Sequence, residues 1–470
     1  MDSLIRKITI FILTLMALFP SWSFADTHAA ASCAYQDVNA AVSASSSGDT
    51  VTVPACTSTT WASQLTITKG ITLQGAGIGN TIIASSQGTG TVMVQYTPAT
   101  PADDTLFRVT GFTFDGNGGN SIGVQVTNSG DTYPLHYIRV DHNRFYHCTT
   151  GVVFGNWNGG GNGRVSGVVD SNTFDDCITW TRAYGSYEVS WNKDPLDLGG
   201  PTGMYVESNT MTMSSAWSSA HPAALHHASS GWGGRYIYRF NTITYNNSNW
   251  QDGFDIHGKQ ACDSSNSGSV SGEIYKNRIS YGVGGGRFVA GRGGQERIYN
   301  NILTNAGNIQ ITDENYSRPG MQCCKSWPCP QMIHVYFWSN INNGSDIASV
   351  GYFYNDVEPK DSTILHEDRD YFLPKGGAFN GSTGVGVGTR AQMDAITPTV
   401  NNVGFWVTDE GSWNTSGSGG QGRLYTASGG AWVLSYTPYK YPHPLTNSQT
   451  NFLTNPLPKN PYPPMDIIVK

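Results

Sequence analysis

A short segment ending in Asn-x-apolar recurs along the middle of the chain. Each copy alternates apolar and polar residues up to an asparagine, and one more apolar residue follows. A unit of this length cannot bury its own apolar face, so stable folding requires the units to stack on one another. Coils at the usual interstrand spacing of about 4.8 Å would let the asparagines hydrogen-bond along the stack as a ladder. The ladder positions are Asn143, Asn172, Asn209, Asn241, Asn277 and Asn301, with a later copy near Asn340 and an imperfect earlier one near Phe112.

Composition supports an all-β chain. The 470 residues include 56 Gly, 24 Tyr, 18 Phe and 13 Trp, while long Leu/Ala/Glu/Lys tracts are absent. A compact sandwich of this length would normally split into domains, whereas the core of a solenoid grows along one axis. The formal charge of −7 gives the chain no long-range attraction for nucleic acid.

The first 25 residues have the pattern of a secretory signal peptide. Arg6 and Lys7 precede an apolar run from Ile8 to Phe19, and Ser23-Phe24-Ala25 places small residues at the first and third positions of a cleavage site. The run is short for a membrane span, which favours cleavage after Ala25 over an uncleaved anchor. We therefore expect a secreted chain, periplasmic or extracellular, that does not contact the membrane after cleavage.

Cysteine spacing predicts disulfide bonds. Cys148 and Cys177 each follow a ladder asparagine by five residues, so stacking would place them side by side, within reach of a bridge. Cys33 and Cys56 flank the N-terminal segment and are expected to join it. The remaining four, whose pairing stays open, suit loop disulfides better than zinc: Cys262, Cys323, Cys324 and Cys329.

The opening YQDVNAAVSASSSGDTVTVPAC and the following LTITKGITLQGAGIGNTII resemble the first coils of exported right-handed parallel β-helix proteins of the pectate-lyase-like superfamily. The resemblance implies a right-handed parallel β-helix over residues 26–370 with a short helix capping its N-terminal end. It implies little about activity, because that superfamily includes polysaccharide lyases, glycoside hydrolases, uronate epimerases, phage tailspikes and adhesins.

The last part, residues 371–470, differs in composition and is rich in aromatic residues, Gly and Pro. We expect a C-terminal region that covers the open end of the stack, followed by an extended tail. An alternative is an aromatic platform for sugars built from Trp406, Trp413 and Trp432.

The stretch 251-QDGFDIHGKQ-260 concentrates titratable groups, and stacking would add others from neighbouring coils. Placing Leu225, Phe254, Phe288 and Ile309 inward predicts two outward columns, since a strand alternates its faces. The first column is His226, Asp255, Val289 and Gln310, and the second is His257, Gly291 and Thr312. Further candidates at the strand ends are Trp250, Asp252, Lys259, Arg287, Arg292, Asp313 and Glu314. Each could instead have a structural role, the aspartates capping turns and the arginines binding loop carbonyls.

This combination suits an extended acidic polysaccharide, and we expect a monomeric enzyme that cleaves a uronate-containing polymer by β-elimination. The reaction needs a cation to neutralise the sugar carboxylate, a base, and an acid for the leaving oxygen. Arg287 and Arg292 could supply the cation, or calcium could, bound by Asp252, Asp255, Asp313 and Glu314. His257 has the most suitable intrinsic pKa for the base. The resemblance adds Lys259 or an arginine as bases, while His226, Gln310 and Trp250 would contact substrate.

Three alternatives stay open. A glycoside hydrolase would need two carboxylic acids, such as Asp252 with Asp255 or Asp255 with Asp313. A uronate epimerase of the resembled superfamily carries Asp-Pro-His, and Asp255-Ile256-His257 lacks the proline. A non-catalytic, glycan-binding or adhesive surface protein needs no reaction centre.

Overall fold

The fold was analysed in a computed structural model of the chain. The structure describes residues 25–128, 133–155, 164–185, 197–220, 226–246, 252–258, 268–282, 287–314, 332–356, 360–416 and 421–447. Within these residues, no helix has the length and apolar character that crossing a membrane requires.

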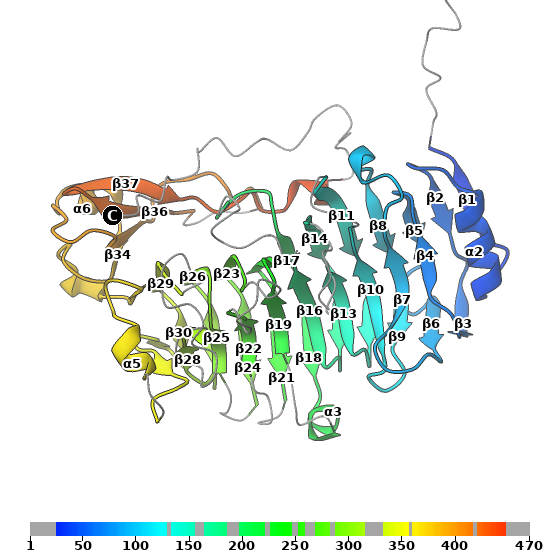
Figure 1. Ribbon diagram of the computed structural model, residues 1–470, viewed down its shortest axis with the longest axis horizontal. Coiled ribbons are helices and arrows are strands. Elements are labelled where there is room, and N and C mark those ends of the chain that lie inside the picture. The colour runs from blue at the N-terminus through cyan, green and yellow to red at the C-terminus, as the bar shows by residue number, and fades with distance from the viewer. Residues whose placement is uncertain are drawn as a thin grey trace, which may run out of the picture.

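The described residues wind into a right-handed parallel β-helix with three long sheets along its sides (Figure 1). Sheet A contains, in spatial order, β1 (Thr27–Ala29), β2 (Thr50–Thr52), β5 (Thr72–Gln74), β8 (Phe107–Thr110), β11 (Leu135–Asp141), β14 (Val165–Asp170), β17 (Met204–Glu207), β20 (Arg235–Arg239), β23 (Ser271–Tyr275), β26 (Gln295–Tyr299), β29 (Val335–Trp338) and β33 (Tyr371–Phe372). Sheet B contains β3 (Cys56–Trp61), β6 (Thr81–Ser85), β9 (Thr113–Asp115), β12 (Arg144–Tyr146), β15 (Thr173–Asp175), β18 (Thr210–Met213), β21 (Thr242–Tyr245), β24 (Arg278–Tyr281), β27 (Ile302–Thr304), β30 (Ile341–Asn342) and β31 (Ser345–Asp346). Sheet C contains β4 (Leu65–Ile67), β7 (Thr91–Tyr96), β10 (Ser121–Val126), β13 (Thr150–Phe154), β16 (Thr179–Tyr184), β19 (His226–Gly231), β22 (Asp252–Ile256), β25 (Arg287–Gly291), β28 (Ile309–Ile311) and β32 (Gly351–Tyr352).

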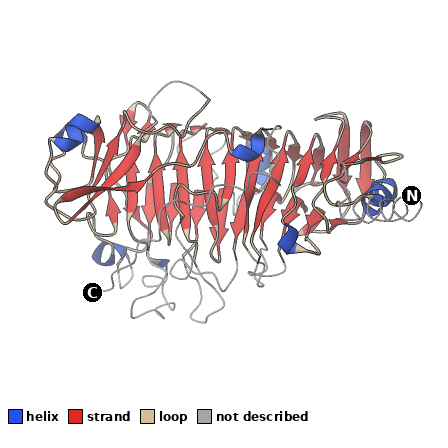
Figure 2. Cartoon of the chain, turned by 90° about the horizontal axis from the view of Figure 1, so that it is seen from above, coloured by secondary structure: helices blue, strands red, loops and turns tan. Residues whose placement is uncertain are grey.

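The remaining elements lie at the ends and on the outside of the stack (Figure 2). A C-terminal sheet contains β34 (Val385–Gly388), β35 (Gly404–Val407), β36 (Arg423–Ser428) and β37 (Ala431–Tyr436). The helices are α2 (Tyr35–Ala44), α3 (Ser215–Ala220), α5 (Asp361–Ile364) and α6 (Arg390–Asp394), with 3-10 turns η1 (Pro101–Asp103), η2 (Gly376–Ala378) and η3 (Pro444–Thr446).

The predicted asparagine ladder is confirmed and runs between sheets A and B. From Asn143 to Asn340, each backbone N–H donates to the Oδ1 of the next ladder asparagine at 2.9–3.3 Å. Each Nδ2 donates to the same oxygen at 2.8–3.2 Å. These side chains are buried, so the ladder satisfies polar groups that would otherwise lose their bonds to water.

The ladder also fixes the corner of each coil. The residue before every ladder asparagine has a left-handed backbone, with φ between 51° and 58° from His142 to Ser339. A non-glycine residue in this conformation costs about 1–2 kcal/mol. The asparagine spans that residue by donating to the carbonyl two positions before itself, as Asn143 Nδ2 does to the Asp141 oxygen at 2.9 Å. The hydrogen bonds thus offset the strain of a turn that repeats in each coil.

The interior of the coil is apolar and continuous. Phe114, Phe145 and Phe174 lie in register on β9, β12 and β15, and their rings stack at 5.7 and 5.0 Å. Tyr245 and Tyr281 lie in register on β21 and β24, with their rings tilted by 49° and their ring centres 6.2 Å apart. Aromatic residues after the ladder corner therefore contact one another from coil to coil.

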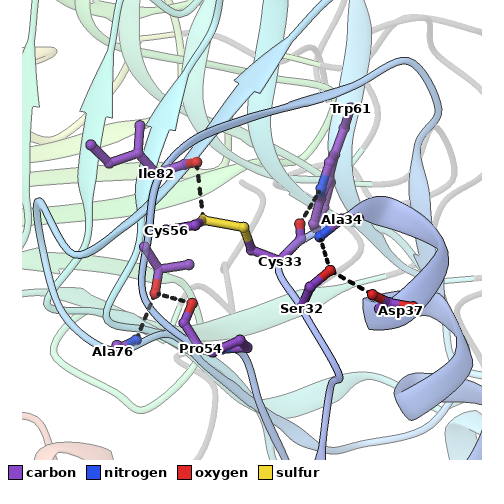
Figure 3. Close-up of a disulfide and its surroundings, with 10 residues drawn as sticks. Ser32, Cys33, Ala34, Asp37, Pro54, Cys56, Trp61, Ala76 and Ile82 are labelled. Carbon is purple, nitrogen blue, oxygen red and sulfur yellow. Dashed lines mark hydrogen bonds between the residues drawn. A yellow bond between two sulfur atoms is a disulfide. The ribbon is translucent and has the colours of Figure 1, made fainter.

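The N-terminal end of the stack is covered by α2, which buries Val38, Ala41 and Val42 (Figure 1). The predicted disulfide between Cys33 and Cys56 is present and ties the segment before this helix to β3 (Figure 3). Trp61 supports the same segment, because its indole N–H donates to the Cys33 carbonyl oxygen at 3.0 Å.

The predicted second bridge is absent, because Cys148 and Cys177 are free, buried thiols. They occupy matching positions of adjacent coils, as expected, and the Ile178 N–H donates to the Cys148 carbonyl oxygen at 2.9 Å. Each thiol lies near a carbonyl of the preceding coil, that of Cys177 being 3.6 Å from the Phe145 oxygen. Both sulfurs thus pack in the core beside each other without a bond. The other four cysteines lie outside the described residues.

The C-terminal region packs along the outer side of sheet A, above the stack in Figure 1. The ring centre of Trp406 lies 5.0 Å from the ring centres of both Tyr299 and Trp338. The ring centre of Trp413 lies 5.7 Å from that of Tyr275. Trp406 and Trp413 are only 2% and 3% exposed, so the expectation of an open aromatic platform for sugars is wrong. This cluster covers a side of the stack, and the cap over the open end stays a prediction.

Charged groups of sheet A lie beneath this cover. Arg239 donates to Glu207 at 2.7 Å and to the carbonyl oxygens of Tyr439 and Lys440 at 2.7 and 2.6 Å. Glu207 in turn accepts the His443 N–H at 2.7 Å. The buried ion pair therefore holds the backbone of the last described segment against sheet A.

Candidate functional site on sheet C

The outer side of β22, β25 and β28 gathers most of the residues singled out from the sequence. Strand β25 places Phe288 and Val289 in succession into the core, so the strict alternation of faces is interrupted there. The register aligns Asp252 with Arg287, and Asp255 with Ala290 and then Gln310.

This register corrects the predicted columns. Val289 lies beside Phe254 in the core instead of beside Asp255, and His226 lies beside Asp252. In the second column Arg292 replaces Gly291, because Ile256, Gly291 and Ile311 are aligned and the residues after them are therefore neighbours. The observed register therefore places the guanidinium of Arg292 next to His257.

Arg287 makes the first ion pair of the site. Its Nε donates to Asp252 Oδ1, its Nη1 donates to Gln310 Oε1 at 3.1 Å, and its guanidinium carbon lies 4.4 Å from the centre of the Phe353 ring. The Arg287 side chain is 29% exposed and that of Asp252 10%. This guanidinium is thus held on three sides and still reaches solvent.

Arg292 makes the second and more enclosed ion pair. Its Nε donates to Asp255 Oδ1 at 3.0 Å, its Nη2 donates to the same oxygen at 2.5 Å, and its Nη1 donates to Glu314 Oε1 at 2.9 Å. Burial alone would lower the pKa of the Arg292 guanidinium, but the carboxylates of Asp255 and Glu314 outweigh burial and raise that pKa above its ordinary value. Arg292 therefore stays charged and holds both carboxylates by hydrogen bonds.

His257 is the half-exposed member of this group. Its side chain is 23% exposed, and its Nε2 lies 2.7 Å from Oδ2 of the buried Asp255. Arg292 Nη2 lies 2.8 Å from both Nδ1 and Nε2 of the ring. An Nε2–H that donates to Asp255 leaves the lone pair of the imidazole on Nδ1. The carboxylate thus sets the tautomer and the orientation of the imidazole.

Glu314 supports this arrangement from the next coil. Its Oε2 accepts the Gly258 N–H at 2.9 Å and lies 3.9 Å from His257 Nδ1. Only a glycine fits at position 258, because an added Cβ would come within 2.2 Å of the Arg292 carbonyl oxygen. Glu314 therefore holds both the guanidinium and the backbone that follows the histidine.

Three of the four predicted calcium ligands already bind arginines in the structure. Asp252, Asp255 and Glu314 are each bound to an arginine, and Asp313 is buried at 2% exposure. Among the residues that the structure describes, no group of three or more His, Cys, Asp or Glu side chains is arranged to hold a metal. A cation at this position would have to displace a guanidinium.

Sequence reasoning missed neighbours on the two preceding coils, which contain β16 and β19. Arg182 is in register with Ser229, which is in register with Asp255, and its pKa is lowered by burial. Tyr184 lies 5.0 Å from Trp232, and burial raises the pKa of Tyr184 to about 12. Carrying the outward column back through the repeat that contains Cys177 would have found Arg182. Phe353 carries no signal in the sequence, since a long loop separates it from β28.

Several predicted residues cannot be placed. Lys259 and Trp250 lie outside the described residues, as does the side chain of His226. The structure therefore brings together Asp255, His257, Arg292 and Glu314, with Asp252, Arg287 and Gln310 beside them on the same three strands.

No protein-family model matches the chain, and no curated protein matches it. Solved structures that match include ORF18 of Geobacillus virus E2, with a TM-score of 0.37 and 12% sequence identity, over 68% of this chain. The chain spans 58% of the length of that protein. A likeness this distant carries no argument about function.

Proposed function

We propose that the outer side of β22, β25 and β28 binds an acidic polysaccharide and cleaves it by β-elimination. The observation that carries this proposal is the pair formed by the half-exposed His257 and the buried Asp255, at 2.7 Å. A carboxylate that orients an imidazole and stabilises its protonated form is the arrangement of a general base.

The uronate carboxylate is placed between the two guanidiniums. Arg287, at 29% exposure, has room to donate to it. As the substrate carboxylate approaches, it accepts a hydrogen bond from Arg292 Nη2, which in the free protein lies 2.8 Å from both ring nitrogens of His257. The Nδ1 lone pair then removes the proton beside the carboxylate, and the resulting imidazolium is paired with Asp255. The imidazolium then donates its proton to the leaving oxygen.

A glycoside hydrolase fits these contacts less well. A retaining or inverting hydrolase needs one carboxylic acid that is protonated and can donate. Asp252 and Asp255 each accept hydrogen bonds from an arginine, so both carboxylates are already engaged inside the protein. Whether calcium assists the reaction is tested in the experiment below by adding a chelator.

A second candidate is glycan binding without catalysis. It is favoured by one observation: both described arginines of the site are already paired with carboxylates inside the protein. A face of paired charges can recognise sugar hydroxyls without any group changing its protonation state.

The experiment is to incubate the purified protein with polyuronates and glycosaminoglycans and to follow the ultraviolet absorbance of the unsaturated product, with and without a chelator. His257→Gln is expected to lower turnover at least about 100-fold, because general-base catalysis contributes that much or more. Arg287→Ala is expected to raise KM strongly. New reducing ends without ultraviolet absorbance would favour a hydrolase, and retention on the polymer without cleavage would favour a binder.

Arg108 provides a matched control. It is also paired with an aspartate, Asp141, on a neighbouring strand, and its side chain is 28% exposed, but it lies on sheet A. Arg108→Ala should leave turnover unchanged. Equal effects of Arg108→Ala and Arg287→Ala would mean that loss of an outer ion pair perturbs the coil in general.

A further inference from the structure

Asp49 is a buried carboxylate directed at the predicted start of the mature chain. Its side chain is 6% exposed, and its Oδ1 accepts the backbone N–H of Asp26 at 2.9 Å. Its Oδ2 accepts the Ser46 N–H at 2.7 Å and lies 3.0 Å from His28 Nε2. The N–H groups of Ser46 and Asp26 lower the pKa of Asp49, so it is an anion at neutral pH.

The ordered stack begins at the same residue. The Asp26 carbonyl oxygen accepts the Thr50 N–H at 2.8 Å, and the parallel pairing of β1 with β2 continues from Thr27. Ala25 and Asp26 are both exposed, and Ser23-Phe24-Ala25 supplies the small residues of a cleavage site. The bond between Ala25 and Asp26 therefore lies where an endopeptidase can reach it without breaking a strand pair.

We infer that cleavage after Ala25 creates an ammonium group on Asp26 that Asp49 binds, so that removal of the signal peptide adds an ion pair to the first coil. This inference rests on the predicted signal peptide and is independent of the proposed polysaccharide activity. An export-linked endopeptidase adds one water across the peptide bond. Ala25 keeps a carboxylate, and the Asp26 nitrogen becomes an amine that takes up a proton.

Only cleavage of the bond between Ala25 and Asp26 places the new ammonium group beside Asp49. The nitrogen 2.9 Å from Asp49 belongs to Asp26, so a cut one residue earlier or later would place the new charge elsewhere. The other titratable groups near this amine are the Asp26 side chain and His28, whose Nε2 lies 3.0 Å from Asp49 Oδ2. A partner anion raises the pKa of an α-amine above its ordinary value of about 7.7–8.0.

The test compares three chains: one beginning at Asp26, one beginning at Ala25, and the Asp26 chain with Asp49→Asn. The mass of the exported protein should first identify Asp26 as its N-terminal residue. At pH near 7.5, acylation of the α-amine should be about tenfold slower in the Asp26 chain than in the Asp49→Asn chain, as expected for a pKa raised by one unit or more.

Melting temperature gives a second readout that does not need the Asp49 variant to fold. A raised amine pKa stabilises the folded state below the ordinary amine pKa and loses this effect as pH rises through the folded value. The Asp26 chain should thus melt above the Ala25 chain at pH 7, and the difference should vanish at alkaline pH. A different N-terminal residue, equal acylation rates, or identical melting profiles would each overturn the inference.

Discussion

The outer sides of sheets A and C carry the same kind of charged pair in two different surroundings. On sheet A, Arg239 and Glu207 are 0% and 1% exposed beneath the C-terminal region. On sheet C, Arg287 is 29% exposed beside Asp252. In both, register on adjacent strands places a guanidinium against a carboxylate. The stacking of coils therefore brings the opposite charges together. The presence of the C-terminal region over a pair determines whether that pair is accessible to a ligand.

On sheet A the C-terminal region covers the ion pair, and the ion pair holds this region against the sheet. Desolvation of two charges costs several kcal/mol per ion, which only good geometry and further hydrogen bonds can offset. Arg239 makes those bonds to the carbonyl oxygens of Tyr439 and Lys440, and Glu207 accepts from the His443 N–H. On sheet C the side chain of Arg287 is 29% exposed, so this guanidinium has access to solvent and to a ligand.

The largest effect is expected from Arg239→Met. Removing this guanidinium leaves Glu207 buried without a counterion and frees two backbone carbonyls, so we expect the free energy of unfolding to fall by about 3–5 kcal/mol. Chemical denaturation measures the change, and limited proteolysis should show faster cutting near residues 439–443. A loss below about 1 kcal/mol would contradict the view that this pair anchors the C-terminal segment.

A smaller effect is expected from pH acting on His443. This imidazole is buried, its Nδ1 accepts the Leu445 N–H at 3.2 Å, and burial together with Arg239 and Arg139 lowers its pKa well below the ordinary value. The groups around it are Arg239, Arg139, Glu207, Tyr205 and Tyr439.

Because the unfolded chain binds a proton at this histidine near pH 6.5 and the folded chain does not, stability is lost as pH falls below 6.5. His443 should contribute a slope of at most ~1.4 kcal/mol per pH unit. His443→Asn keeps an acceptor for Leu445 and should flatten the acid side of the stability profile. An unchanged slope in denaturation curves between pH 6.5 and 4.5 would assign the acid sensitivity to other groups.

The two sheets also show what the sequence could predict. The ladder was predictable because one side chain, asparagine, marks each corner, and no knowledge of the strand faces is needed. The columns on sheet C were not, because β25 turns both Phe288 and Val289 inward and shifts every later residue relative to a strict alternation. Sequence reasoning did group Asp255 and His257 with arginines, but it could not place Arg292 beside the imidazole. The packing of Trp406 on sheet A depends on contacts more than 100 positions away, for which the local pattern has no signal.

The smallest effect on stability is expected from Arg287→Met, the counterpart of Arg239→Met on the open face. An ion pair with access to water contributes about 0–1 kcal/mol, and methionine keeps the apolar contact with Phe353. Chemical denaturation should therefore detect a loss of less than about 1 kcal/mol, although substrate binding falls if the proposed site is correct. A loss as large as that of Arg239→Met would mean that Arg287 is a structural anchor as well. Sheets A and C would then differ in the burial of their ion pairs and not in the contribution of those pairs to stability. The proposed function would rest on His257.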